Sequence, residues 1–166
     1  MKLKKLTRCA LFAALMAICA WLAVPVGEIS VTMQSFALFL TLGLLGGRQG
    51  SAACAVYLLL GAVGLPVFSG FQGGFGVLLG PTGGYLWGFL AAALIYWLVS
   101  TRFPKWLAMG LGMLGCYACG TAWFYFAYGQ IGLWAVLLKC VAPYLLPDAA
   151  KIAFALLMTK KIENMT

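Results

Sequence analysis

Apolar residues dominate this chain in long runs, which short polar or glycine-rich stretches separate. Six such runs can be read, at residues 6–26, 31–47, 51–65, 83–99, 106–128 and 134–159. A helix needs about 20 mostly apolar residues to cross the hydrocarbon core of a bilayer, which is about 30 Å thick. The pattern therefore predicts an all-α fold, a single domain over residues 1–166 built as a bundle of six transmembrane helices.

The composition favours a membrane protein over a soluble one. Hydrophobic residues make up 64% of the chain and charged residues only 8%, whereas a soluble domain carries about 25% charged residues. A soluble sphere of 166 residues could not bury this much apolar surface. We therefore expect an exterior that faces lipid.

Basic residues occur in every second connection between the apolar runs. They precede the first run, separate the second from the third and the fourth from the fifth, and follow the sixth: Lys2, Lys4, Lys5, Arg8, Arg48, Arg102, Lys105, Lys160 and Lys161. The cytoplasmic loops of membrane proteins carry an excess of Lys and Arg. The alternation predicts an even number of spans, with both termini in the cytoplasm.

The N-terminal region also imitates a secretory signal peptide, because basic residues 1–8 lead into the apolar run 6–26. A signal peptide has an apolar region of only about 7–15 residues and a small-residue cleavage site. The run here has the length of a spanning helix and lacks an Ala-x-Ala ending. We expect it to be retained as the first helix.

The chain is poor in groups that carry out acid–base or metal chemistry. It has no His and three acidic residues in all, whereas an active site needs clustered carboxylates, His or Cys. Cys116 and Cys119 form a C-x-x-C pair, but no second pair and no His accompany them. We expect these thiols to serve as small apolar side chains in helix contacts. The prediction is a protein without catalytic residues or a metal site, and not an enzyme.

The connection over residues 65–85 is unusual for an outer loop. It contains seven glycines and two prolines among large apolar residues, and it carries no charge. A helix would not hold so much glycine, and a solvated loop would be more polar. The segment suits a non-helical lid over a pocket mouth, whose glycines let backbone N–H groups approach a ligand closely. The alternative is a re-entrant loop with a purely structural role.

A pair of oppositely charged residues lies deep inside the last apolar run, well beyond Lys139 near its start. Asp148 and Lys151 are three positions apart and therefore share one face of a helix. Ionisable residues within the membrane are costly and usually functional, so we expect the pair to contact a ligand; a structural ion pair is the alternative. Pro147 before Asp148 suits the first residue of a helix that restarts at a binding cavity.

Three further residues have two readings each. Gln34, at the outer start of the second run, either lines the same outer cavity or marks the membrane interface. Ala10 and Ala14 have the spacing at which small residues let helices approach closely. On the pattern alone, these alanines would pack within this chain.

With these residues assembled, the chain resembles the BioY family, the biotin-binding membrane subunits of energy-coupling-factor (ECF) transporters. The resemblance runs from Arg8 to Lys161. The segments that carry it are Val-Thr-Met-Gln-Ser-Phe at 31–36, the stretch 58–68, Gly-Pro-Thr-Gly-Gly-Tyr at 80–85, and Pro-Asp-Ala-Ala-Lys at 147–151. Met33 stands where family members often carry Pro or Phe, and this change is apolar.

The resemblance implies a six-helix subunit of the bacterial cytoplasmic membrane that captures biotin outside and carries it inward. Such a subunit joins a transmembrane coupling protein and two cytoplasmic ATPases, so ATP is used by the partners and this chain needs no cofactor. The family's first helix carries an alanine-rich docking motif, which Ala10 and Ala14 match. The resemblance therefore makes this pair a partner-docking surface.

Biotin suits the chemistry of the singled-out residues. Its ureido ring offers two N–H donors to the Asp148 carboxylate and one carbonyl acceptor to Lys151. Its carboxylate could accept hydrogen bonds from lid N–H groups or from the side chain of Gln34 or Gln72. Its apolar parts suit a mostly hydrophobic pocket. The expected substrate-binding residues are Asp148, Lys151, Gln34, Gln72, Gly73, Gly74, Phe75, Thr82 and Tyr85. The alternatives are a subunit of the same class for another water-soluble vitamin and a structural membrane protein.

Overall fold

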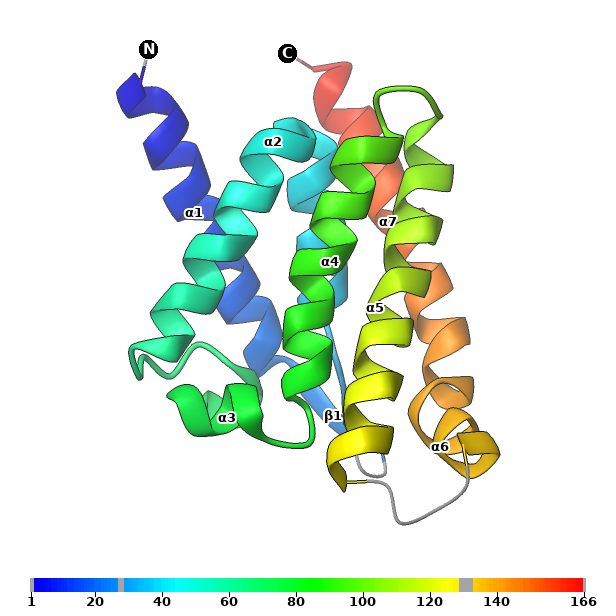
Figure 1. The fold of residues 1–166 in the computed structure, drawn as a ribbon. Helices are drawn as coiled ribbons and strands as arrows, with labels where there is room; N and C mark the ends of the chain where they lie inside the picture. Colours follow the sequence, from blue (N-terminus) through cyan, green and yellow to red (C-terminus); the bar gives the residue numbers. More distant parts are fainter. Residues whose placement is uncertain (1, 27–28, 129–132, 166) are drawn as a thin grey trace.

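A computed structural model of the protein describes residues 2–26, 29–128 and 133–165. In chain order the elements are α1 (Lys2–Trp21), β1 (Ala23–Val26), β2 (Ile29–Thr32), α2 (Gln34–Ala62), the 3-10 helix η1 (Ser69–Phe71), α3 (Phe75–Leu79), α4 (Gly83–Val99), α5 (Lys105–Tyr128), α6 (Leu133–Cys140) and α7 (Ala142–Glu163). The long helices run side by side, and both ends of the chain lie at the same end of the bundle (Figure 1).

The element α2 consists of two helical halves joined at Gly46. This glycine has φ 75° and ψ 168°, a conformation that side-chain-bearing residues rarely adopt. After it the chain runs back beside the first half, and a Cβ added at Gly50 would lie 2.8 Å from a methyl of Leu42. The predicted runs 31–47 and 51–65 are thus confirmed as two helical stretches, with a tight turn at Gly46 between them.

Two predicted helix boundaries were wrong, the C-terminal end of the first helix, 6–26, and the N-terminal end of the second, 31–47. An antiparallel hairpin lies there, with Ala23 opposite Thr32 and Val26 opposite Ile29. Its β-branched residues favour a strand, and Pro25 lacks the N–H that a helix interior requires. The hairpin closes where the N–H of Met33 donates to the carbonyl of Leu22 over 3.1 Å.

The last predicted run, 134–159, is also two helices rather than one. The backbone leaves helical geometry at Val141 (φ −124°, ψ −51°), and α7 starts at Ala142 with Pro143 in its first turn. The expectation that Pro147 begins this helix was wrong, since Pro147 lies inside α7. The reason is that Pro143 already takes the first turn, where a missing N–H costs nothing.

The connection between α2 and α4 contains short helices, so the prediction that the lid is non-helical was wrong in part. It holds η1 and the five-residue α3. Gly70, inside η1, and Gly74, just before α3, have φ 70° and 96°, so Gly74 sets the break between the two helical pieces. We keep the name lid for residues 66–82.

Helices α4 and α5 pack backbone against backbone. A Cβ added at Gly88 would lie 2.9 Å from the carbonyl oxygen of Cys116, and one at Gly112 would lie 2.9 Å from that of Ala92. Trp123 of α5 donates its Nε1 to the carbonyl of Gly80 over 3.1 Å, which fixes the end of the lid. Close approach through small residues is the usual way that helices associate in lipid.

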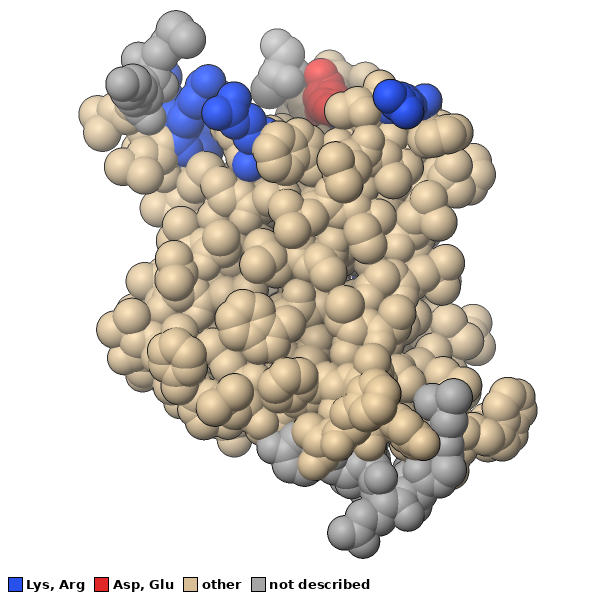
Figure 2. Space-filling model, viewed as in Figure 1, with Lys and Arg blue, Asp and Glu red and all other residues tan. Residues whose placement is uncertain are grey.

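Charged residues gather at one end of the face drawn in Figure 2. The Lys, Arg, Asp and Glu atoms on this face lie at the end where the chain termini lie, and the residues across its middle are uncharged. At this end Lys105 pairs with Glu163 at 2.5 Å, which joins the start of α5 to the end of α7. Among the described residues, one helix is both long and apolar enough to cross a membrane, Lys105–Ala127 with 23 residues; the apolar helix Gly83–Val99 is shorter.

Candidate ligand-binding site

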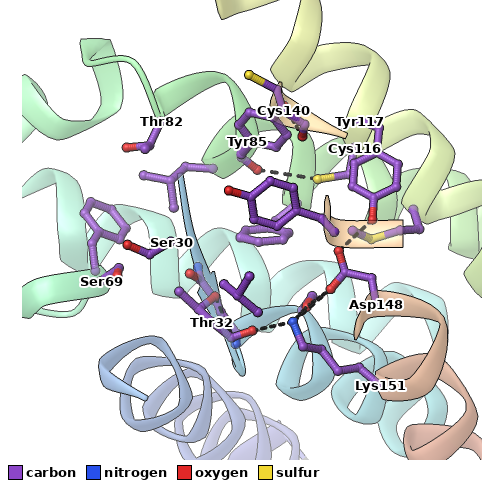
Figure 3. A pocket seen from close by; sticks show the side chains of 18 of the residues that line it. Ser30, Thr32, Ser69, Thr82, Tyr85, Cys116, Tyr117, Cys140, Asp148 and Lys151 are labelled. Carbon is purple, nitrogen blue, oxygen red and sulfur yellow. Dashed lines mark hydrogen bonds and ion pairs between the residues drawn. The ribbon is translucent and has the colours of Figure 1, made fainter. Parts of the chain in front are cut away.

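A cavity of about 340 Å³ lies between the hairpin, the lid and the helices. Its walls come from β2, the first turn of α2, the lid between residues 68 and 82, and α4, α5, α6 and α7. In Figure 3, Asp148 and Lys151 lie at one side of it, and Ser69 and Thr82 at the other. The apolar side chains on its walls are Val31, Phe68, Val77, Leu86, Phe89 and Met113.

Asp148 and Lys151 form an ion pair in this cavity. The Nζ of Lys151 lies 2.9 Å from Oδ1 of Asp148, and their spacing on α7 is the predicted i, i+3. Asp148 is only 6% exposed. Removing a charged pair from water costs free energy unless further hydrogen bonds satisfy both groups. The other partners of Asp148 and Lys151 therefore determine whether the pair is satisfied.

Two hydroxyl groups complete the surroundings of the Asp148 carboxylate. Ser35 donates its Oγ to Oδ1 over 2.9 Å, and Tyr117 donates its OH to Oδ2 over 2.7 Å. With Lys151 this gives three donors on one carboxylate, which fix its orientation. The carboxylate therefore faces the cavity as a preformed acceptor.

Lys151 also reaches beyond its own helix. Its Nζ donates to the carbonyl of Thr32 over 2.7 Å and to Oγ of Ser35 over 3.2 Å. These contacts connect α7 with the end of the hairpin and the start of α2. An ammonium group has three protons, and the contacts to Asp148, Thr32 and Ser35 engage all of them.

The sequence reasoning missed Ser35 and Tyr117. Ser35 lies 113 residues from Asp148, and Tyr117 lies 31 residues from it. Neither spacing is visible as a local pattern. The signal that existed was the presence of hydroxyl groups inside apolar runs, because such groups need a partner when they are buried.

Gln34 lies in the cavity wall rather than at a membrane interface, which decides between the two readings given above. It is 3% exposed and lines the cavity. Its Nε2 donates to the hydroxyl of Tyr57 over 2.8 Å, and Tyr57 donates in turn to the carbonyl of Val67 over 3.0 Å.

Gln72, Thr82 and Tyr85 also line the cavity, as expected. The hydroxyl of Tyr85 donates to the carbonyl of Cys140 over 3.1 Å and so joins α4 to α6. The thiol of Cys116 is buried in the same wall, while Cys119 points outward and is exposed. This placement agrees with a helix-contact role for Cys116, which meets Gly88.

Gly73, Gly74 and Phe75 do not line the cavity, so the structure does not bring these three predicted ligand contacts together with the others. Gly73 packs against the carbonyl of Leu65, from which an added Cβ would be only 2.2 Å away. Phe75 begins α3 with its ring turned outward and 64% exposed. The lid residues that reach the cavity are Phe68, Ser69, Gly70, Gln72, Val77 and Thr82.

Aromatic contacts anchor the lid. Trp21, at the end of α1, donates its Nε1 to the carbonyl of Pro66 over 2.8 Å and stacks on Phe71 with ring centroids 4.8 Å apart. Phe68 is buried against Tyr57, edge to face at 5.6 Å.

On the outer face of α1, Ala10 and Ala14 are both exposed.

Comparison with known proteins places this chain in a family. The BioY family matches it over residues 1–166. The chain belongs to the BioY family. Among its relatives, the biotin transporter BioY of Thermotoga maritima is 43% identical over 122 residues, covering 71% of this chain and 72% of the relative. The probable biotin transporter BioY of Pyrococcus horikoshii is 34% identical over 166 residues, covering 100% of both.

A solved structure confirms the BioY fold. A crystal structure described as the S-component for biotin from an ECF-type ABC transporter matches with a TM-score of 0.87 and 24% identity, covering 98% of this chain and 92% of that one. The predicted all-α fold is thus confirmed as a mostly helical fold that matches this S-component, with the hairpin β1–β2 as the exception. BioY proteins are membrane transport components and not enzymes, so the prediction that this chain is not an enzyme is confirmed as well.

Proposed function

We propose that this BioY protein binds biotin at the cavity described above and takes it across the membrane as the substrate-specific subunit of an ECF-type transporter. The observation that carries the proposal is the buried Asp148–Lys151 pair in the wall of a cavity of about 340 Å³. This volume is in the range of about 300–1,000 Å³ that small-molecule sites occupy.

The pair matches the ureido ring of biotin. A urea presents N–H and C=O groups next to each other, and Asp148 and Lys151 present an acceptor beside a donor on one face of α7. Charge-assisted hydrogen bonds of this kind are about twice as strong as neutral ones. The ureido ring therefore lies at the α7 side of the cavity.

The remainder of the ligand extends toward the lid. Leu86, Phe89 and Met113 supply apolar surface for the thiophane ring and the valeryl chain. The carboxylate then reaches the opposite side, where Gln72 and Thr82 offer donors, as does the backbone of residues 69–70. The Tyr85 ring contributes to the same wall.

In the membrane, this single domain crosses six times, by α1, the two halves of α2, α4, α5 and α7. Both termini lie at one end of the bundle, and so do the Lys and Arg residues on the face drawn in Figure 2, whereas Lys151 lies in the cavity (Figures 1 and 2). This end faces the cytoplasm, because cytoplasmic loops carry the excess of positive charge. The lid then faces the outside, from where biotin enters.

The partners are a transmembrane coupling subunit and two cytoplasmic ATPases, which use ATP, whereas this chain holds no cofactor of its own. Ala10 and Ala14 are exposed on α1, beside Leu11 and Ile18. Two small side chains one turn apart leave room for the backbone of a partner helix to approach. This face of α1 is the docking surface.

Equilibrium binding of labelled biotin to the purified, detergent-solubilised protein tests the proposal, with unlabelled biotin, thiamine and riboflavin as competitors. Tight binding that only biotin displaces supports it. Displacement by thiamine or riboflavin supports the alternative, a subunit for another vitamin. No binding by protein shown to be folded would remove the transport function and leave a structural membrane protein.

A further inference from the structure

Tyr57 lies behind the cavity and does not line it, yet it connects two parts of the wall. It belongs to the second half of α2 and is 1% exposed. Its hydroxyl lies 2.8 Å from Nε2 of Gln34 and 3.0 Å from the carbonyl oxygen of Val67, at the start of the lid. A single hydroxyl thus holds one side chain of the cavity and the first residues of the lid.

The chemistry of these three groups fixes the direction of both hydrogen bonds. A backbone carbonyl can only accept, and a phenol has one proton. The proton of Tyr57 therefore goes to Val67, and the Tyr57 oxygen must accept from Gln34. If the Gln34 amide were reversed, its oxygen would face an oxygen whose proton is already engaged. Tyr57 thus selects one of the two amide orientations.

The selected orientation turns the carbonyl oxygen of Gln34 away from Tyr57. Among the described residues, no protein donor reaches this Oε1, although the side chain is 3% exposed and lines the cavity. An acceptor in the cavity wall that no protein donor engages is available to accept a ligand N–H. The next residue, Ser35, donates to Asp148, so the acceptor lies in the same turn of α2 as the ion-pair site.

We propose that Tyr57 is a positioning residue that presents Oε1 of Gln34 to an N–H donor of the ligand. This deepens the proposed function and rests on it. For biotin, Asp148 accepts one ureido N–H and Gln34 accepts the other, while Lys151 donates to the ureido carbonyl. Gln34 is then a specificity residue for the ureido ring and not a ligand of the carboxylate.

A double-mutant cycle tests the link between the two residues. We expect Gln34→Leu to weaken equilibrium binding of biotin about tenfold and Tyr57→Phe about fivefold, the sizes typical of one lost or misoriented hydrogen bond. The double variant should bind as Gln34→Leu does, within about twofold, because Tyr57 acts through Gln34. Tyr96→Phe is the matched control, since Tyr96 is equally buried and does not line the cavity; it should bind biotin normally. Additive losses would overturn the positioning role.

A ligand analogue tests which end of biotin Gln34 contacts. In the alcohol made by reducing the biotin carboxyl group, the ureido ring is unchanged and the carboxylate is gone. Gln34→Leu should lower the affinity for this alcohol by the same factor as for biotin. Loss of the effect with the alcohol would assign Gln34 to the carboxylate and overturn the inference, as would unaltered biotin binding by Gln34→Leu. If the wild-type protein binds no biotin at all, the proposed function itself fails, which is a different result.

Discussion

The wall around Asp148 and the lid across from it enclose the same cavity, but they are held in different ways. Around Asp148, side chains from α2, α5 and α7 meet in hydrogen bonds of 2.7–2.9 Å. The lid is held by its backbone, through Trp21 at Pro66, Tyr57 at Val67 and Trp123 at Gly80. The first wall is preorganised for one pattern of donors and acceptors. The second is a flap with three such attachments, so selectivity and closure belong to different walls.

Asp148→Asn breaks the first wall and should have the largest effect. The neutral amide leaves Lys151 without its counter-charge and turns an acceptor into a partial donor, so we expect biotin affinity to fall at least tenfold, or about 1.4 kcal/mol. Equilibrium binding measures the loss, and a thermal melt shows that the protein is folded. Glu163→Gln, which removes the exposed pair with Lys105, is the control and should bind normally. Unchanged affinity in Asp148→Asn would take this residue out of the site.

Tyr117→Phe tests whether the donors behind the carboxylate matter. It removes one hydrogen bond to Asp148 and leaves the ring in place. We expect an affinity loss of about fivefold, because a hydrogen bond contributes about 1 kcal/mol net. Competition binding on purified protein checks this. A loss as large as that of Asp148→Asn would mean that Tyr117 contacts biotin directly.

Trp21→Leu weakens the attachment of the lid without touching the ion pair. Loss of the stack on Phe71 and of the bond to Pro66 should speed biotin dissociation about threefold, with a smaller change in equilibrium affinity, since both ligand entry and exit become faster. Stopped-flow or filter-based dissociation measurements distinguish the two effects. Trp134→Leu, an exposed tryptophan of α6, is the control. A dissociation rate equal to that of the wild type would show that Trp21 does not hold the lid.

Ala10→Leu with Ala14→Leu leaves both walls intact and should have no effect on affinity. Uptake of biotin by cells that contain the whole transporter should nevertheless be lost, because the added side chains block the approach of the partner helix. Ala118 and Ala122 have the same spacing and are exposed on α5; the same replacement there is the control and should spare uptake. If binding were lost together with uptake, misfolding would explain both.

The sequence predicted what local spacing encodes. The i, i+3 relation of Asp148 and Lys151 and the bounds 83–99 of one helix agree with the structure, because both follow from helical periodicity and composition. The hairpin at 23–32 was missed because its β-branched residues continue the apolar pattern of the neighbouring helices. The break at Val141 was missed because the apolar run continues across it, although Pro143 marks the first turn of α7.

The contacts that complete the site are tertiary, and one sequence does not reveal them. The hydroxyl groups of Ser35, Tyr117 and Tyr57 are isolated polar groups within apolar runs. The packing of the helices determines which partners these hydroxyl groups meet. The outward turn of Phe75 follows from where α3 begins, which no propensity in a stretch so rich in glycine determines. Family resemblance supplied the ligand, but not these contacts.

The engaged ammonium group of Lys151 has a consequence for how a ligand is recognised. Each of its three protons already has an oxygen partner, on Asp148, Thr32 and Ser35. An arriving carbonyl must therefore replace one of these oxygens, so docking is an exchange of partners and not a gain of one. If the Thr32 carbonyl is the one displaced, the end of the hairpin loses its hydrogen bond to Lys151 when the ligand binds. Binding in the cavity is thereby coupled to the conformation of the segment that follows α1.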